Sequence, residues 1–342
     1  MNIGIIGYGY WGPNLVRNFS RVEDCTVKTC ADLDPKRREA MREKYPHVKA
    51  TAYYKEILGD PEILGVVIAT PVETHFSLAK EALERGKHVL IEKPITRTSE
   101  EARELVGIAK KRELVLMVDH TFEYSPAINK IKEIIKSSEL GKIFTIDMIR
   151  VNLGLFQKKV NVVWDLAPHD ISILHYLLED MPEKAWGIGD AHVQDGIEDD
   201  AHVSLLFKSN IRANLHVSWL DPCKIRRITI VGNKKMLVFD DTLKEGKITI
   251  YDKGVTIEKN RIPMQPYYTT LEEWELVYRS GESYSPEIND KEPLLMMAEH
   301  FVECVQKNRS PVSDGVSGWR VIKVMEAVQE SLKNSGKEVG VR

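Results

Sequence analysis

The chain has 342 residues, which is too long for one ordinary hydrophobic core and predicts about two domains. Its 48 basic and 51 acidic side chains leave a net charge of −3, so no overall positive charge favours nucleic acid as a partner. No uncharged apolar run approaches the ~20 residues of a membrane span, and no basic, apolar leader precedes the first predicted strand. We therefore expect a cytoplasmic protein that binds neither nucleic acid nor membrane.

The first predicted elements are a short strand, a glycine turn and a helix. Residues 3–6 form an apolar run, and residues 14–19 have helical spacing. Between them, Gly7, Gly9 and Gly12 have the G-x-G-x-x-G spacing. In this setting Gly7 permits the tight turn, Gly9 lets a pyrophosphate approach the backbone, and Gly12 lets helix and strand pack closely. The free N–H groups of the helix would face the phosphates, so the sequence predicts a dinucleotide site.

The next predicted strand, 27–31, ends at Asp32. A carboxylate there would accept hydrogen bonds from the adenosine ribose and would repel a 2′-phosphate, which favours NAD over NADP. Lys36, Arg37 and Arg38 follow closely and could pair with that phosphate, so NADP stays the less favoured alternative. A plain glycine turn with Asp32 capping a helix is the structural alternative to any cofactor site.

Strands and helices then alternate up to residue 121. Helices are predicted at 35–45, 53–58, 75–86 and 98–110, and strands at 65–69, 87–91 and 114–118. The strands are continuous apolar runs, as parallel strands covered on both faces should be. Short connections between alternating elements predict a doubly wound α/β (Rossmann) sheet, which we assign to a dinucleotide-binding domain of residues 1–121.

The pattern changes near Phe122, and strands dominate from Lys142 onward. Strands are predicted at 143–151, 201–207, 211–217, 225–231, 235–239 and 247–251, and helices at 128–135, 168–178, 294–306 and 319–332. Turn signals between the strands predict hairpins and a mostly antiparallel sheet. We therefore expect an α+β domain of residues 122–342, with its C-terminal helices packed back on the first domain.

The cysteines have no spacing typical of a metal site. Cys25, Cys30, Cys223 and Cys304 fit neither C-x-x-C nor a zinc finger, and no His or carboxylate stands beside them at a recognisable spacing. We expect reduced thiols and no metal ion.

Glu92, Lys93 and Pro94 directly follow a predicted strand of the first domain. In open α/β sheets ligands lie beyond the carboxyl ends of the strands, so Lys93 is predicted to reach into the crevice. Pro94 suits a cis peptide bond. An exposed lysine beside a helix-starting proline is the alternative.

Asp165 and His169 form a second candidate pair. Their i, i+4 spacing puts both side chains on one face if the stretch is helical, and Pro168 suits a first helical turn, which would leave Asp165 just before the regular helix. A carboxylate beside an imidazole selects its tautomer and raises its basicity. Alternatively, Asp165 caps the helix and His169 is structural. Hydride transfer to a nicotinamide needs a group that takes the alcohol proton, and His169 or a desolvated Lys93 could be that base.

These residues carry a resemblance to a known family. The matching motifs are Gly7-x-Gly9-x-x-Gly12, Asp32, Thr70-Pro71-x-x-x-His75, Gly86-Lys87-His88-Val89, Glu92-Lys93-Pro94 and Asp165-x-x-x-His169. The chain resembles the glucose–fructose oxidoreductase, inositol dehydrogenase and rhizopine-catabolism (Gfo/Idh/MocA) family from its first strand to its last helix. The resemblance implies a Rossmann domain followed by an open-faced sheet domain that serves substrate binding and oligomerisation. It implies a homodimer or homotetramer formed through that sheet, and oxidation or reduction of a sugar or cyclitol hydroxyl. It also implies that Lys93, Asp165 and His169 surround the reacting carbon.

A finer resemblance concerns the substrate. Residues 152–154 and 160–170 are similar to the nucleotide-sugar branch, whose members include dehydrogenases acting at C3 of UDP-N-acetylglucosamine or its uronic acid. The chain has Ala167-Pro168 where Asp-x-Gly-x-His is more common, and residues 122–126 depart from the usual Arg-Phe-x-Pro. We therefore predict an NAD(H)-dependent dehydrogenase of a sugar or nucleotide sugar, with an inositol dehydrogenase as the alternative.

The predicted site residues fall into three groups. The catalytic residues are Lys93, Asp165 and His169. The cofactor residues are Gly7, Gly9, Tyr10, Trp11, Gly12, Asp32, Arg37, Thr70, Pro71, His75, Glu92 and Lys93. The substrate residues are Lys93, His120, Tyr124, Arg150, Asn152, Asp165 and His169. Arg150 and Asn152 are included because a basic segment before Asp165 could hold a diphosphate.

Two hypotheses from other functional classes also agree with the sequence. The first is a regulator that binds NAD without turnover, since a fold does not fix a function. The second is a glycosidase that uses NAD for a transient oxidation, with Tyr124 or Glu123 as the additional acid or base.

Overall fold

The computed structural model describes residues 1–257 and 276–341 and divides the chain into two compact units. Unit 1 comprises residues 1–128, 171–176 and 290–326, and unit 2 comprises residues 129–170, 177–289 and 327–342. Segments beyond residue 121 therefore contribute to unit 1 as well as to unit 2.

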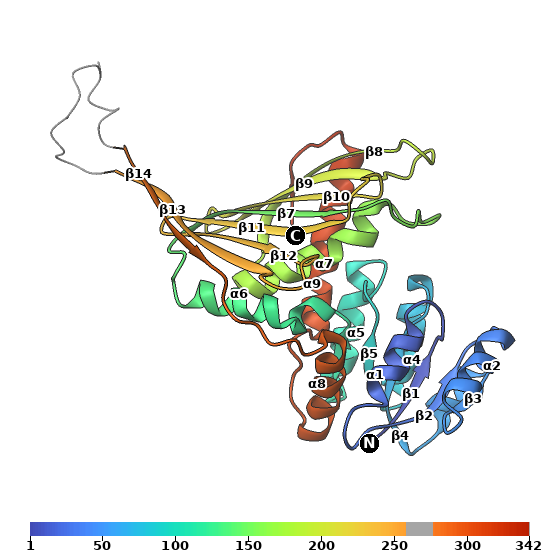
Figure 1. The fold of residues 1–342 in the computed structure, drawn as a ribbon. Helices are drawn as coiled ribbons and strands as arrows, with labels where there is room; N and C mark the ends of the chain where they lie inside the picture. The colour runs from blue at the N-terminus through green and yellow to red at the C-terminus, as the bar shows by residue number, and fades with distance from the viewer. Residues whose placement is uncertain (258–275, 342) are drawn as a thin grey trace, which may run out of the picture. The chain divides into compact units, whose positions relative to one another are not determined.

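Unit 1 contains a six-stranded parallel sheet in the order β3-β2-β1-β4-β5-β6 (Figure 1). The strands are β1 (Asn2–Ile6), β2 (Thr26–Ala31), β3 (Lys49–Thr51), β4 (Ile63–Ile68), β5 (His88–Ile91) and β6 (Leu116–Val118). This order is that of a doubly wound dinucleotide-binding sheet, with the chain reversing its direction of winding between β1 and β4. The predicted Rossmann sheet is confirmed; β3 was not predicted, since it is only three residues long.

Unit 1 contains the helices α1 (Gly12–Phe19), α2 (Pro35–Lys44), α3 (Tyr54–Gly59), α4 (His75–Glu84) and α5 (Ser99–Lys111), with short 3₁₀ turns η1 (Val72–Thr74) and η2 (Thr121–Tyr124). Of the helices named here, α1 has a proline at its start, α2 has both a proline and a side-chain cap, and α5 has a side-chain cap. The Asp34 side chain accepts a hydrogen bond from the N–H of Lys36 at 2.8 Å and caps α2. The Thr98 side chain caps α5 by accepting from the N–H of Glu101 at 3.3 Å.

The C-terminal helix α8 (Pro293–Lys307) belongs to the hydrophobic core of unit 1. Its Phe301 is fully buried and meets the ring of Phe19 on α1 edge to face, with centroids 6.1 Å apart. On β4, a Cβ added to Gly65 would stand 3.1 Å from Phe301, so the glycine makes room for the ring. A distant segment of the chain thus completes the core of the N-terminal unit.

Unit 2 is built on a nine-stranded sheet in the order β14-β13-β12-β11-β7-β10-β9-β8-β15 (Figure 1). The strands are β7 (Ile143–Val151), β8 (Pro182–Asp190), β9 (Asp200–Phe207), β10 (Arg212–Ser218), β11 (Ile225–Gly232), β12 (Met236–Asp240), β13 (Ile248–Ile257), β14 (Leu276–Tyr284) and β15 (Val339–Gly340). The β7–β10 pair is parallel and the other pairs are antiparallel. The predicted mostly antiparallel sheet is confirmed, although β8, β14 and β15 were not predicted.

The two faces of this sheet differ in character. On β9 and β10, buried Ala201, Val203, Leu205, Ala213 and Leu215 alternate with partly or fully exposed polar residues. The buried face is covered by helices, among them α6 (Pro126–Lys136) and α7 (Val162–Leu178) (Figure 1). The end of α9 (Gly315–Lys333) packs on β8, where a Cβ at Gly187 would stand 3.1 Å from Val328. On β9 and β10 the second face is polar and open, whereas on β8 it also carries the exposed Ile188.

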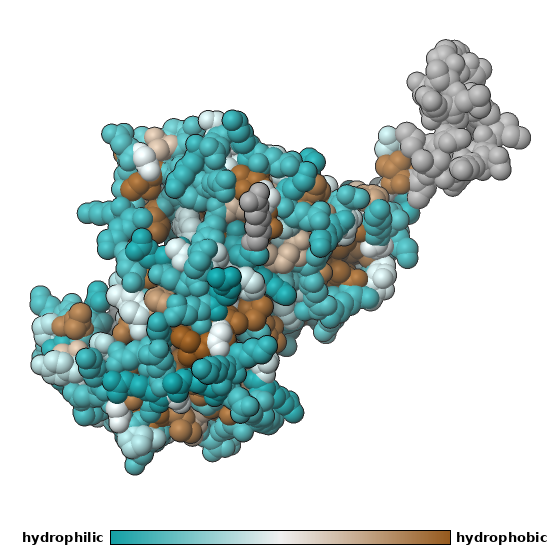
Figure 2. Space-filling model, turned by 180° about the vertical axis from the view of Figure 1, so that it is seen from behind, coloured by the Kyte–Doolittle hydropathy of each residue, from teal (hydrophilic) through white to brown (hydrophobic). Residues whose placement is uncertain are grey.

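Among the described residues, no helix is long and apolar enough to span a bilayer. Figure 2 shows one side of the molecule, on which hydrophilic residues cover most of the surface and hydrophobic residues gather in small groups.

Candidate functional site

The glycine turn after β1 has the geometry that a bound dinucleotide needs. Gly7 has a φ of +101°, and a Cβ there would stand 2.3 Å from the carbonyl oxygen of Ala69. A Cβ at Gly12 would stand 2.3 Å from the carbonyl oxygen of Gly7, so neither position accepts a side chain. Over Gly9, by contrast, only the guanidinium of Arg37 among the described residues lies within 4 Å. The backbone at Gly9 is therefore open to a pyrophosphate at the start of α1.

Asp32 stands at the carboxyl end of β2 and joins that strand to the turn. Its Oδ2 accepts a hydrogen bond from the N–H of Tyr8 at 2.7 Å, and its Oδ1 accepts from the N–H of Asp34 at 2.8 Å. The side chain is only 8% exposed. Two carboxylate oxygens offer about four lone-pair sites, so two backbone bonds leave capacity for ribose hydroxyls.

The basic residues after Asp32 have different environments. Arg38 donates from Nη1 to the carbonyl oxygens of Asp32 and Leu33, so it stabilises the backbone of the turn after β2. Arg37 is half exposed, and its Nη1 lies 3.6 Å from Asp32 Oδ2. Arg37 is therefore a basic group placed beside the carboxylate that would bind a cofactor ribose.

The ends of β4 and β5 are tied together by His75. Its Nε2 lies 2.8 Å from the carbonyl oxygen of Thr70, and its Nδ1 lies 2.8 Å from the carbonyl oxygen of Pro94. Burial lowers the pKa of His75, while the hydrogen bonds to the two carbonyls oppose that shift. The Lys93–Pro94 peptide bond is cis, as the sequence suggests. His75 thus links the turn after β4, which contains Pro71, to the turn after β5, which contains Lys93.

A group of buried polar residues lies at the ends of β5 and β6. Asp119 accepts a hydrogen bond from the indole N–H of Trp11 at 3.1 Å, and the hydroxyl of Thr121 also donates to it. Burial, followed by the neighbouring Asp119 carboxylate, raises the pKa of Glu92 well above its usual range. Burial, followed by the charges of His175 and Lys93, lowers the pKa of His120 to about 3, so this imidazole is neutral at physiological pH. Sequence reasoning missed Asp119, although its position directly after a parallel strand could have identified it.

The remaining predicted residues of unit 1 lie in contrasting environments. Tyr10 is 86% exposed and stacks on Trp11, with ring centroids 6.4 Å apart. Tyr124 lies in the hydrophobic core, and its hydroxyl is 3.2 Å from that of Ser313. Burial raises the pKa of Tyr124 far above its usual value, and its predicted contact with substrate stays a prediction.

In unit 2, Asp165 and His169 both lie within α7. The helix begins at Val162, not at Pro168 as predicted, because Asn161 supplies a start signal: its Oδ1 accepts a hydrogen bond from the N–H of Trp164 at 3.1 Å. Pro168 is an interior residue of the helix. The i, i+4 spacing therefore puts Asp165 and His169 on one face of a helix, and both are partly exposed.

Trp219, just beyond β10, is a second residue that the sequence analysis missed. Its indole N–H donates to Asp165 Oδ2 at 3.0 Å, and the ring is buried against Phe156. This bond orients one carboxylate oxygen and stabilises its charge. No local sequence signal connects Trp219 with Asp165, because the contact depends on how β10 lies beside α7.

Arg150, predicted as a diphosphate ligand, is part of a buried ion pair. The guanidinium forms a bidentate pair with Asp170, with Nε–Oδ1 at 3.0 Å, Nε–Oδ2 at 3.1 Å and Nη2–Oδ1 at 2.7 Å. This pair joins β7 to α7 directly beside His169, and the contact of Arg150 with a substrate stays a prediction. Asn152 follows β7 and donates its N–H to the carbonyl oxygen of Ser218 at 3.2 Å.

Two family models match the chain. The model described as "Oxidoreductase family, NAD-binding Rossmann fold" covers residues 1–120, and the Gfo/Idh/MocA C-terminal domain covers residues 128–238. The chain belongs to the Gfo/Idh/MocA family. It is therefore an NAD-binding oxidoreductase, and the resemblance described above is confirmed.

Members of the Gfo/Idh/MocA family with assigned reactions match over almost the full length. The UDP-N-acetylglucosamine 3-dehydrogenase of Acidithiobacillus ferrooxidans is 26% identical, over 97% of each chain. The myo-inositol 2-dehydrogenase of Thermotoga maritima is 24% identical, over 97% of this chain and 96% of the relative. An oxidoreductase from Agrobacterium radiobacter, solved with NAD⁺, L-tartaric acid and magnesium, has the same fold, with a TM-score of 0.81, 18% identity and coverage of 100% and 98%.

Proposed function

We propose that the chain is an NAD(H)-dependent dehydrogenase or ketoreductase acting on a secondary hydroxyl or ketone of a sugar. The observation that carries this proposal is the pair of Asp165 and His169 on one face of α7, with the indole of Trp219 fixing the carboxylate. We favour a nucleotide sugar, such as UDP-N-acetylglucosamine or its uronate reacting at C3. The match to a UDP-N-acetylglucosamine 3-dehydrogenase at 26% identity supports that choice.

In the proposed mechanism His169 accepts the alcohol proton during oxidation and returns it during reduction. Its imidazole has an intrinsic pKa close to working pH, which suits a general base. Asp165 orients the ring and stabilises the imidazolium that forms, while Trp219 keeps the carboxylate from rotating.

Lys93 is proposed to hydrogen-bond the reacting oxygen. It stands at the carboxyl end of β5, where ligands of open α/β sheets bind, and His75 fixes the turn through Pro94. An ammonium donor there would stabilise developing negative charge on that oxygen. The reverse assignment, with Lys93 as base and His169 as donor, stays open and is separated by the variants below.

Gly9 would admit the pyrophosphate of a dinucleotide, and Asp32 would accept hydrogen bonds from its adenosine ribose. When bound, the nicotinamide supplies the hydride acceptor or donor. We propose NAD over NADP, because the Asp32 carboxylate would repel a 2′-phosphate. Arg37 beside Asp32 is the residue that could weaken this preference. Tighter binding of NADPH than of NADH, measured by fluorescence titration, would overturn the assignment.

The decisive experiment is to follow reduced-nicotinamide absorbance while the protein and NAD are offered UDP-sugars, free sugars and inositols. We expect reduction with a UDP-sugar alone. Reduction with free sugars or inositols would keep the oxidoreductase chemistry and reject the nucleotide-sugar substrate.

Variants separate the two proton-transfer assignments. His169→Asn and Lys93→Met should each retain NADH binding and lose turnover by about 10²–10⁴-fold. The residue whose loss abolishes the pH dependence of kcat is the base. Lys80→Met, which removes a partly exposed lysine of α4, is the matched control and should leave turnover unchanged. Full activity of both site variants would reject the mechanism.

The second candidate substrate is a cyclitol. The match to a myo-inositol 2-dehydrogenase covers 97% of the chain at 24% identity, and the reaction would use the same Lys93, Asp165 and His169. Reduction of NAD with myo-inositol, and none with UDP-sugars, would select this alternative.

A further inference from the structure

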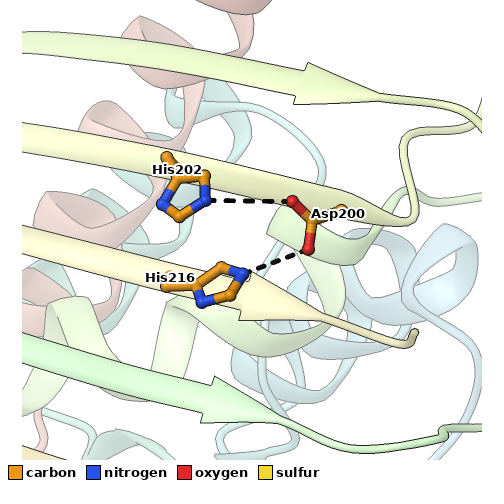
Figure 3. A group of neighbouring side chains, drawn as sticks. All are labelled: Asp200, His202 and His216. Atoms are coloured by element: carbon orange, nitrogen blue, oxygen red, sulfur yellow. Dashed lines mark hydrogen bonds and ion pairs between the residues drawn. The ribbon is translucent and has the colours of Figure 1, made fainter. Parts of the chain in front are cut away.

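The open face of the unit 2 sheet carries a cluster of two histidines and one carboxylate. Asp200 and His202 lie two residues apart on β9, so their side chains leave the same face of the strand. On β10, His216 is the direct cross-strand partner of His202. Strand register therefore brings the three side chains together (Figure 3).

Both imidazole rings direct a nitrogen toward the Asp200 carboxylate. Asp200 lies beside the two rings in Figure 3, with Oδ2 at 3.1 Å from Nε2 of His216 and Oδ1 at 4.0 Å from Nε2 of His202. The rings stack, with centroids 4.2 Å apart and planes inclined by 12°. One donor atom from each residue lies within 4.8 Å of the others.

This cluster is separate from the proposed oxidoreductase residues of unit 2. In the β7–β10 register, Val217 pairs with Arg150, whose side chain reaches α7, whereas His216 pairs with Ile149 on the opposite face. The histidine cluster therefore lies on the face of the sheet that turns away from α7.

The donor set is that of a borderline divalent transition metal. Two imidazole nitrogens and one carboxylate oxygen are ligands that zinc accepts at about 2.0–2.2 Å, with water in the fourth tetrahedral position. Tetrahedral coordination at that length requires donor atoms about 3.3 Å apart. The Asp200–His216 distance of 3.1 Å already meets this requirement. The His202 side chain is 69% exposed, so it can rotate from its stacked position to bring Nε2 closer.

The local charge also favours a cation. Asp190 on β8 is the direct cross-strand partner of Asp200, so two carboxylates stand side by side on this face. Like charges in that position destabilise a sheet. A divalent ion bound to Asp200 would remove that repulsion. Sequence spacing could not reveal the cluster, since its ligands come from two strands joined by a turn and no cysteine takes part.

We propose that Asp200, His202 and His216 form a zinc site on the open face of the sheet, with Nε2 of each histidine and the Asp200 carboxylate as ligands. The bound ion links β9 to β10 and stabilises unit 2.

The test is calorimetric titration of zinc chloride into the untagged, chelator-treated full-length protein. We expect one equivalent per chain, and a rise in the midpoint temperature of unfolding when zinc is present. The His202→Gln and His216→Gln variants should each weaken binding roughly 100-fold, the share of one ligand in a zinc site. Cobalt in place of zinc should give the visible absorption of a four-coordinate ion in the wild type and lose it in both variants.

His192→Gln is the matched control. His192 also contacts a carboxylate, with Nδ1 at 2.7 Å from Asp199, and it is exposed in the same unit, but it lies outside the cluster. This variant should bind zinc as the wild type does. Zinc binding that His202→Gln and His216→Gln leave unchanged, or a stoichiometry well below one, would overturn the proposal. Circular dichroism of the zinc-free variants checks that they fold.

Discussion

At the scale of single residues, the carboxyl of Glu92 is unusual in its hydrogen bonding and in its pKa. The residue as a whole is partly exposed, but its Oε1 is buried and receives no hydrogen bond in the part of the chain that the structure describes. Burial and the carboxylate of Asp119 raise its pKa well above the usual range. A buried carboxyl beside a second carboxylate favours its protonated form, so folding and protonation are linked at this position.

The linkage has a defined sign. Since the folded-state pKa of Glu92 is raised above the unfolded value of about 4.5, its contribution to stability is fully present below pH 4.5 and is lost as pH rises toward the folded-state pKa. Each unit of pKa displacement corresponds to about 1.4 kcal/mol. The Glu92→Gln variant keeps the shape and removes the titration. We therefore expect its midpoint temperature of unfolding, relative to wild type, to increase between pH 4.5 and pH 8.

The matched control for this measurement is Glu39→Gln, which changes an exposed glutamate on α2. Its difference from the wild type should stay nearly constant over the same pH range. A Glu92→Gln difference that is constant, or that shrinks as pH rises, would contradict the raised pKa.

Trp219 gives a second prediction at this scale, and it rests on the proposed pairing of Asp165 with His169. Trp219→Phe removes the indole N–H that donates to Asp165 Oδ2 at 3.0 Å. Losing a hydrogen bond to a charged group should cost about 1.5–3 kcal/mol of unfolding free energy. Without the indole the carboxylate can rotate away from the imidazole and stabilises the imidazolium less, so the acidic limb of the kcat–pH profile should move to lower pH.

Trp186→Phe, at a partly buried position on β8, is the control and should leave that limb in place. If Trp219→Phe lowers stability but leaves the profile unchanged, the indole supports the fold alone and has no influence on proton transfer.

At the scale of elements, the sequence predicted best where signals are local. The β1–α1–β2 segment was predictable because strand periodicity, the glycines and Asp32 all lie within one continuous stretch. The start of α7 was predicted too late in the chain, because Pro168 is a strong signal for a first helical turn. The cap that starts the helix is Asn161, which lies upstream of Pro168. Strand β8 was missed because Gly187 weakens its pattern; that glycine is required by Val328 of α9, which packs on it. The periodicity of hydrophobic residues along a strand cannot predict a packing contact with a distant segment such as α9.

The orientation of α7 depends on the buried Arg150–Asp170 pair, which links the helix to β7. Removing Arg150 takes the bidentate partner from the buried Asp170, which keeps only its weaker interaction with the charge of Arg226, so Arg150→Met should lower the unfolding free energy by about 3–5 kcal/mol. The Arg150→Met, Asp170→Leu double variant should recover much of this loss, since it removes both members of the buried pair. Urea denaturation of the four proteins of the double-mutant cycle measures both effects.

An exposed pair provides the comparison. Lys307 and Glu303 form an i, i+4 ion pair on α8, at 2.8 Å, with about half of each side chain exposed. Lys307→Ala should therefore cost at most about 1 kcal/mol. A similar loss for Arg150→Met would mean that the buried pair does not hold α7 on the sheet.

At the scale of the whole molecule, the order of segments in the chain does not match their grouping in space. Unit 1 needs residues 290–326, and unit 2 includes residues from both sides of that segment. The first unit is therefore incomplete until the C-terminal part of the chain has been made. This arrangement ties the dinucleotide-binding sheet to α8 through Phe301, whose fully buried ring meets Phe19.

Phe301→Ala tests that dependence. Deleting a fully buried aromatic ring should lower the unfolding free energy by about 3–5 kcal/mol. Because Phe301 packs over Gly65 on β4, amide exchange should accelerate in β1 and β4, while β9 and β10 keep their wild-type exchange rates. Glu303→Ala, on the partly exposed side of the same helix, should leave both regions unchanged. Equal acceleration of amide exchange in all four strands would mean that the two units unfold as one cooperative body. The loss of α8 packing would then destabilise both units.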